Sequence, residues 1–182
     1  SFNNSNVTWG TGSTVEIIGV GGTPPTNLSQ AFYNFIWNNP NQSNWLTLNL
    51  TGSFSIGGNL KVMSKGGSDK GIVFATSTNR TYNISGHFEI DGGKVELTSG
   101  TGIVTMNIGG DLLLSDNALN LLDLGWGNGS PAGSYRSIVY LSGDLNIGAG
   151  STFTCNKSVI NLPETKSSAY TKTAQQNNTP NS

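Results

Sequence analysis

A short glycine-centred motif occurs four times in this chain, and it limits the possible folds more than any other feature. Each copy has the pattern apolar, small, glycine, polar, apolar, any residue, apolar. The copies span residues 56–62, 84–90, 108–114 and 141–147. Their central glycines are 28, 24 and 33 residues apart, at Gly58, Gly86, Gly110 and Gly143. Repeats with periods of about 20 to 50 residues are typical of solenoids, so each copy predicts one coil.

The residues around the repeats predict short strands. Apolar and polar residues alternate, as at Leu46, Leu48 and Leu50, and a period of two indicates a strand. Glycine, asparagine, serine and threonine occur every few residues and disfavour helix interiors. We expect each repeat glycine to take a positive φ at a corner, and the flanking apolar residues to stack on their equivalents one coil away. The sequence therefore predicts an all-β protein, a right-handed parallel β-solenoid (β-helix). Hairpins in a β-sandwich, joined by long connections, are the alternative.

The two ends of the chain differ from the repeats. Residues 1–45 are predicted to form an N-terminal capping and first-coil segment, in which a proline-containing stretch blunts the exposed strand edge. Residues 46–161 are predicted to form the solenoid coils. Residues 162–182 contain few large apolar side chains, which predicts a polar tail or linker. Unprotected solenoid edges can also pair between chains, so end-to-end self-association is a further expectation.

Several classes of function are disfavoured by composition. Nine Lys and Arg against ten Asp and Glu give a net charge of −1, without the basic excess that nucleic-acid binding requires. No apolar run approaches the ~20 residues of a membrane span. One cysteine and one histidine exclude an internal disulfide framework and most histidine-based metal sites. No phosphate-binding or dinucleotide-binding motif is present, so we predict a chain without cofactor, bound metal or enzymatic activity.

One stretch of the chain carries a resemblance to a known group of proteins. Residues 24–38 read Pro-Pro-Thr-Asn-Leu-Ser-Gln-Ala-Phe-Tyr-Asn-Phe-Ile-Trp-Asn. Together with the four repeats, this stretch resembles the repetitive β-solenoid regions of large secreted surface proteins from Bacteroidetes, over roughly residues 7–160. The resemblance implies export, an extracellular or cell-surface location, and an adhesive or stalk-like role within a longer polypeptide. It supplies no catalytic residues.

The densest acidic cluster suggests a different function. Glu89 and Asp91 are two residues apart, so on a strand both side chains point to the same face. Paired carboxylates in a groove carry out glycoside cleavage. The other interpretation, which we favour, is a solvated face whose carboxylates keep the sheet soluble. Lys94 across the turn would partly neutralise the two carboxylates in either case.

The position after each repeat glycine is polar in all four copies. With the coils in register, these residues would form a ladder at one corner: Asn59, His87, Asp111 and Asp144. Asp111 and Asp144 could supply carboxylate oxygens to Ca²⁺. Asparagine and aspartate also commonly cap the backbone amides of turns, and this interpretation is favoured.

Aromatic residues are the remaining candidates for a contact surface. Trp126 and Tyr135 lie in or beside the glycine-rich insertion 125–134, and insertions in repeat proteins often collect at a binding face. Trp37 lies in a strand with large rings on both faces, so it is either a binding residue or part of the core. We predict a non-catalytic structural or adhesive module whose partner is a cell-surface glycan or a neighbouring protein. A carbohydrate-binding module is the second possibility, and a polysaccharide-active enzyme the third.

Overall fold

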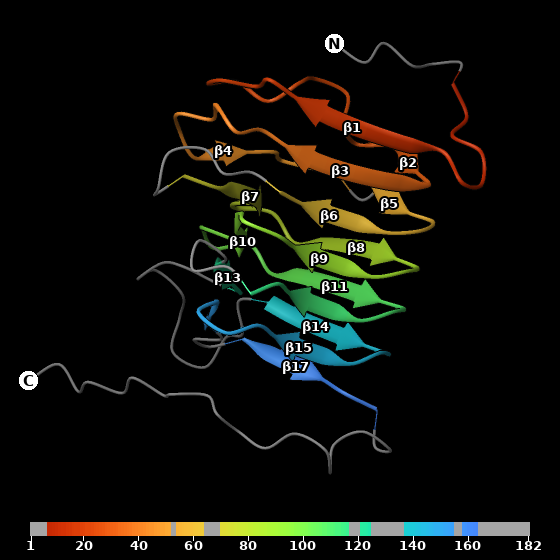
Figure 1. The fold of residues 1–182 in the computed structure, drawn as a ribbon, viewed down its shortest axis with the longest axis vertical. Helices are drawn as coiled ribbons and strands as arrows, with labels where there is room; N and C mark the ends of the chain where they lie inside the picture. Colours follow the sequence, from red (N-terminus) through yellow and green to blue (C-terminus); the bar gives the residue numbers. More distant parts are fainter. Residues whose placement is uncertain are drawn as a thin grey trace, which may run out of the picture.

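The computed structural model describes residues 7–51, 54–63, 70–116, 121–124, 137–154 and 158–163. In these ranges all regular structure is β, and every strand pairing is parallel. The fold is a right-handed parallel β-solenoid, which confirms the predicted architecture over the sandwich. Figure 1 shows the coils stacked along the longest axis of the molecule, with the first strands at the top.

Each coil contributes one strand to each of three sheets, in the order sheet B, sheet A, sheet C. Sheet A consists of β1 (Thr14–Ile18), β3 (Asn34–Asn38), β6 (Leu60–Val62), β9 (Phe88–Ile90), β12 (Leu112–Leu114) and β15 (Leu145–Ile147). Sheet B consists of β2 (Ala31–Phe32), β5 (Ser55–Ile56), β8 (Arg80–Ile84), β11 (Val104–Ile108), β14 (Ser137–Leu141) and β17 (Val159–Asn161). Sheet C consists of β4 (Leu46–Thr47), β7 (Ile72–Ala75), β10 (Lys94–Thr98), β13 (Leu121–Asp123) and β16 (Thr152–Thr154).

The core is made of rows of apolar side chains that run from coil to coil. Strand pairing places equivalent inward-facing residues directly above one another, for example Phe35, Leu60, Phe88 and Leu112. All four are at most 2% exposed. Burial of a side chain of this size stabilises the fold by about 1.5–3 kcal/mol. The alternation of apolar and polar residues in the sequence is therefore the alternation of inward and outward side chains in each strand.

Six aromatic rings form a connected cluster inside the first three coils. Neighbouring rings lie 5.0 to 6.3 Å apart between centroids, in tilted or edge-to-face arrangements; they belong to Phe32, Phe35, Phe54, Phe74, Tyr82 and Phe88. Tyr82 satisfies its hydroxyl in the core by donating to the carbonyl oxygen of Leu50 at 2.8 Å. These six aromatic residues are thus core components.

The repeat glycines are required for a different reason from the one expected. The glycines with positive φ in the described residues are Gly12, Gly19, Gly92 and Gly150, and none of them is a repeat glycine. The repeat glycines instead leave room for the preceding coil. A Cβ atom on Gly86 would lie 2.2 Å from Asn59 Oδ1 and 2.7 Å from the carbonyl oxygen of Gly58. The expectation of a positive φ is therefore wrong, and close packing between coils explains the motif.

The first 45 residues contain β2 and β3 of the first coil, preceded by a segment, residues 7–18, that packs against that coil and that we call the cap. β2 and β3 already belong to sheets B and A, and β1 pairs with β3 from Thr14 to Ile18. Before β1, the Trp9 ring packs 5.8 Å from the Phe32 ring, and its Nε1 atom donates to Gln30 Oε1 at 3.3 Å. At the other end of the chain, residues 164–182 of the predicted tail lie outside the described ranges.

Candidate functional site

Five polar side chains form a line along the corner between sheets B and A, which we call the corner ladder. Each of the first four side chains accepts a hydrogen bond from the backbone N–H of its equivalent in the next coil. The four bonds join Asn34 Oδ1 to the N–H of Asn59 (2.9 Å), Asn59 Oδ1 to that of His87 (2.8 Å), His87 Nδ1 to that of Asp111 (2.9 Å), and Asp111 Oδ1 to that of Asp144 (2.7 Å). The geometry confirms both the predicted ladder and the capping interpretation.

Asn34 is a member of the ladder that the repeat motif does not reveal. The corner in the first coil has one residue fewer than the others, because Phe32 pairs with Ile56 whereas Phe35 pairs with Leu60. Tyr33 also stands where each later copy has its central glycine. The spacing of Phe32 and Phe35, which are three residues apart and both buried, is the signal that could have identified this first copy.

The chemistry of the ladder limits what Asp111 and Asp144 can do. Asp111 Oδ1 caps the backbone of Asp144, and its other oxygen, Oδ2, lies 3.3 Å from His87 Nδ1. In the described part of the chain, no three His, Cys, Asp or Glu side chains come together as a metal site would require. The carboxylate that the calcium hypothesis needs is thus already used in holding two coils together.

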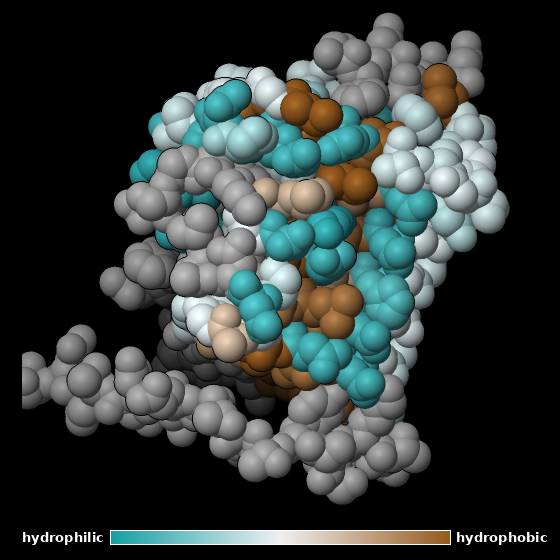
Figure 2. Space-filling model, in the orientation of Figure 1, coloured by the Kyte–Doolittle hydropathy of each residue, from teal (hydrophilic) through white to brown (hydrophobic). Residues whose placement is uncertain are grey.

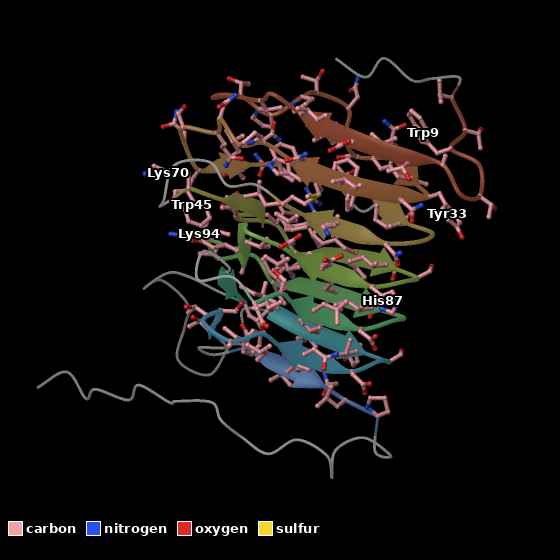
Figure 3. The ribbon with its side chains drawn as sticks, viewed as in Figure 1. Trp9, Tyr33, Trp45, Lys70, His87 and Lys94 are labelled. Carbon is pink, nitrogen blue, oxygen red and sulfur yellow. The ribbon has the colours of Figure 1, made fainter. Side chains whose placement is uncertain are left out.

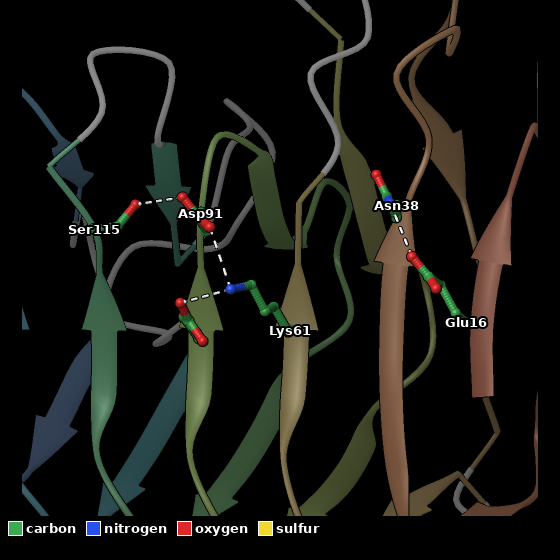
Figure 4. Close-up of polar contacts among 6 residues, drawn as sticks. Glu16, Asn38, Lys61, Asp91 and Ser115 are labelled. Atoms are coloured by element: carbon green, nitrogen blue, oxygen red, sulfur yellow. Dashed lines mark hydrogen bonds and ion pairs between the residues drawn. The ribbon is translucent and has the colours of Figure 1, made fainter. Parts of the chain in front are cut away.

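Glu89 lies in β9 and Asp91 directly follows that strand, and both carboxylates contact the same ammonium group, as their spacing on one face predicts. Lys61 Nζ, one coil earlier on β6, is 2.9 Å from Glu89 Oε1 and 3.2 Å from Asp91 Oδ2 (Figure 4). Ser115 Oγ donates to Asp91 Oδ1 at 2.9 Å.

The Lys61 ammonium therefore bridges the two carboxylates that the glycosidase hypothesis requires. Partial burial lowers the pKa of Lys61, but the hydrogen bonds and charges of Glu89 and Asp91 outweigh this effect and raise the pKa above its ordinary value. The ammonium thus stays charged between the two carboxylates, where a glycosidic bond would have to lie. This arrangement favours the solvated, neutralised face over the catalytic pair.

Of the three predicted contact residues, only Trp37 lies within the described part of the chain. Trp37 is fully buried in β3, and its Nε1 atom donates to Gln42 Oε1 at 3.1 Å. It has no exposed ring face for a ligand, so the interpretation of Trp37 as a binding residue is corrected to a core position. Trp126 and Tyr135 lie outside the described residues, and their role stays a prediction.

Two partly exposed aromatic rings lie against glycines of the second coil, a feature that the sequence analysis did not identify. A Cβ atom on Gly58 would lie 3.0 Å from Tyr33 Cε1, and one on Gly71 would lie 2.7 Å from Trp45 Cζ3. Figure 3 shows Tyr33 and Trp45 at opposite edges of the solenoid, with Trp45 beside Lys70 and Lys94. The alignment of neighbouring coils is the signal that could have identified these rings, because an aromatic side chain can cover a glycine at the equivalent position of the next coil.

The outer face of sheet A and its flanking corners are predominantly acidic. Among the described residues, this surface has one lysine, Lys61, and several carboxylates. The carboxylates belong to Glu16, Glu89, Asp91, Asp111 and Asp144. Figure 2 shows hydrophilic side chains interspersed with hydrophobic ones over the visible face. The other described cations, Lys70, Arg80 and Lys94, stand at or beside the starts of strands in sheets B and C. Charge is thus unevenly distributed on a chain of nearly zero net charge.

The comparisons with known proteins returned no match to any family model, curated protein or solved structure. Among the described residues, no helix has the length and apolar character needed to cross a membrane.

Proposed function

We propose that this chain is a non-catalytic extracellular module, a rigid spacer in a larger surface protein that carries adhesive contacts on its outer faces. The observation that carries the proposal is the corner ladder, which connects five consecutive coils by side-chain-to-backbone hydrogen bonds. Each of these bonds adds to the backbone hydrogen bonds of three continuous sheets. Such repetition along one axis suits a part that must keep its shape and spacing.

The side chains on the outer faces also support a role without catalysis. Glu89 and Asp91, which a glycosidase would need as acid and base, are both engaged by Lys61. The single histidine caps the backbone of Asp111 and forms part of the structure.

The proposal is tested with the full chain coupled to beads. Beads are passed under flow over surfaces coated with polysaccharides, glycoproteins and extracellular matrix proteins, and retention is measured against uncoupled beads. We expect retention on at least one surface, and no release of reducing ends from soluble polysaccharides by the free chain. Retention on none of the surfaces would overturn the adhesive part. Reducing ends released by the wild type and abolished in Glu89→Gln would make the chain an enzyme.

A carbohydrate-binding module is the second candidate. It has support from Trp45, a partly exposed ring held in place by its neighbours. A glycan array probed with the wild type, Trp126→Ala and Trp45→Ala compares the predicted loop site with this one. Binding lost only in Trp126→Ala would assign recognition to the insertion at 125–134.

A further inference from the structure

Trp45, Gly71 and Lys94 occupy one row across three neighbouring coils. Leu46 pairs with Ile72, and Ile72 pairs with Val95, so the residues that precede these three strand positions are aligned as well. Lys70 comes directly before Gly71 in the chain. The fold thus places one indole ring and two ammonium groups together at the start of sheet C, as Figure 3 shows.

Because Gly71 has no side chain, the indole ring of Trp45 packs directly against its backbone. A Cβ atom there would lie 2.7 Å from Trp45 Cζ3 and 2.6 Å from Lys94 Cβ, so the ring and the lysine stem both occupy that space. The carbonyl oxygen of Gly71 accepts hydrogen bonds from the Leu46 N–H at 3.0 Å and from Gln42 Nε2 at 2.6 Å. The ring therefore rests on backbone that is anchored to the first coil, and little ordering remains to be done when a ligand binds.

Trp45 is the described tryptophan that combines such support with flanking cations. Trp37 is fully buried, and Trp9 packs on Phe32 as part of the cap. Trp45, Lys70 and Lys94 are each partly exposed. An amphipathic ring with a fixed position is suited to packing against the C–H groups of a sugar, and an ammonium group forms charge-assisted hydrogen bonds with a carboxylate or sulfate.

We propose that Trp45, Lys70 and Lys94 form a binding site for an acidic polysaccharide, in which one sugar ring packs on the indole and its carboxylate or sulfate contacts the lysines. The site rests on the proposed adhesive function and gives it a ligand class. A single ring with two lysines matches one acidic sugar. A nucleic-acid strand requires a cationic groove along several nucleotides, and the outer face of sheet A is acidic.

Affinity electrophoresis tests the site, with the full chain run in gels that contain a polyuronate, a sulfated galactan or neutral dextran. We expect retardation by at least one acidic polymer, no retardation by dextran, and a weaker effect at high salt because the ion pairs are screened. The polymer that retards the chain identifies the acidic group. Equal retardation by dextran, or stronger binding to single-stranded DNA than to either acidic polymer, would overturn the proposal.

Variants assign the binding to these residues. Trp45→Ala should weaken binding at least about tenfold, a large change for one interaction. Because Trp45→Ala could disturb the corner, Lys70→Gln is compared with Arg80→Gln, which removes the same charge at the start of β8. Only Lys70→Gln should weaken binding. If both tryptophan and lysine variants bind as the wild type does, the site is wrong. In that case, continued retention of the beads on other surfaces would show that the adhesive function is correct even though this site is not.

Discussion

The Nδ1 atom of His87 accepts a hydrogen bond from the backbone N–H of Asp111, one coil further on, at 2.9 Å. An imidazole nitrogen can accept a hydrogen bond only when it carries no proton. Asn59, at the same position one coil earlier, uses its amide oxygen for the same task. The single histidine of the chain thus replaces an amide in a structural ladder, and its neutral form must carry the proton on Nε2.

We predict that His87 is the Nε2–H tautomer when neutral, and that an amide can replace it. His87→Asn should keep the acceptor and change the free energy of unfolding by less than about 0.5 kcal/mol. His87→Leu removes the acceptor and should cost about 0.5–1.5 kcal/mol. Urea unfolding measures both variants, and ¹⁵N NMR of the ring nitrogens reports the tautomer. A proton found on Nδ1 in the neutral ring would contradict the ladder geometry.

Close packing between coils makes the repeat glycines intolerant of any side chain. Gly143→Ala would place a Cβ atom 2.3 Å from Asp111 Oδ1 and 2.4 Å from the carbonyl oxygen of Gly110, so the coils must separate. We expect a loss of at least about 2 kcal/mol in the free energy of unfolding. Gly21→Ala is the matched control, because its Cβ atom would meet nothing within 4 Å. Comparable losses in the two variants, measured by thermal unfolding, would refute the packing explanation.

The solenoid was predictable because the sequence signals that indicate it are regular spacings between residues. Strand alternation and the glycine-centred motif depend only on residue order, and both correspond to in-register rows in the structure. The ladder was predictable for the same reason from Asn59 onward. Asn34 was missed because the first corner is one residue shorter, which shifts the copy out of the pattern.

Contacts between coils were less accessible to sequence reasoning, because they depend on register between segments more than 20 residues apart. Lys61, 28 residues before Glu89, forms ion pairs with Glu89 and Asp91, and these residues lie side by side because β6 pairs with β9. The large rings on both faces of its strand left a binding role open for Trp37 beside the core position until its place on the inward face of β3 was known. The role of Gly71 under Trp45 likewise depends on pairing between β4 and β7.

The ion pairs of Lys61 predict a pH dependence at the alkaline end. The pKa of Lys61 in the fold lies above the ordinary lysine value of 10.5, so its stabilising effect is complete below that pH and is lost as pH rises through the folded-state pKa. Lys61→Gln should therefore cost about 0.5–1 kcal/mol at pH 8 and less at pH 11. Urea unfolding at both pH values measures the difference.

Lys70→Gln serves as the control for the Lys61 experiment, because Lys70 forms no ion pair with another described residue. Its unfolding free energy should differ little from that of the wild type at either pH. The ion-pair explanation would be wrong if the cost of Lys61→Gln stayed constant or grew between pH 8 and pH 11.

Gln42 is a buried residue whose side-chain hydrogen bonds connect the first coil to the second. It is 1% exposed, its Oε1 atom accepts from Trp37 Nε1 at 3.1 Å, and its Nε2 atom donates to the carbonyl oxygens of Asn44 and Gly71 at 2.9 and 2.6 Å. Gln42→Leu keeps much of the volume but leaves the buried indole N–H without its acceptor. We expect a loss of about 2–4 kcal/mol, since an unsatisfied buried polar group costs about 1–3 kcal/mol.

Gln30→Leu provides the comparison, because Gln30 also accepts from an indole N–H but does so at the partly exposed cap, at 3.3 Å from Trp9 Nε1. Water can replace Gln30 there, so this variant should cost no more than about 1 kcal/mol. Urea unfolding of both variants, followed by tryptophan fluorescence, makes the test. If Gln30→Leu costs as much as Gln42→Leu, burial does not determine the strength of these two bonds, and the first coil is held chiefly by its cap.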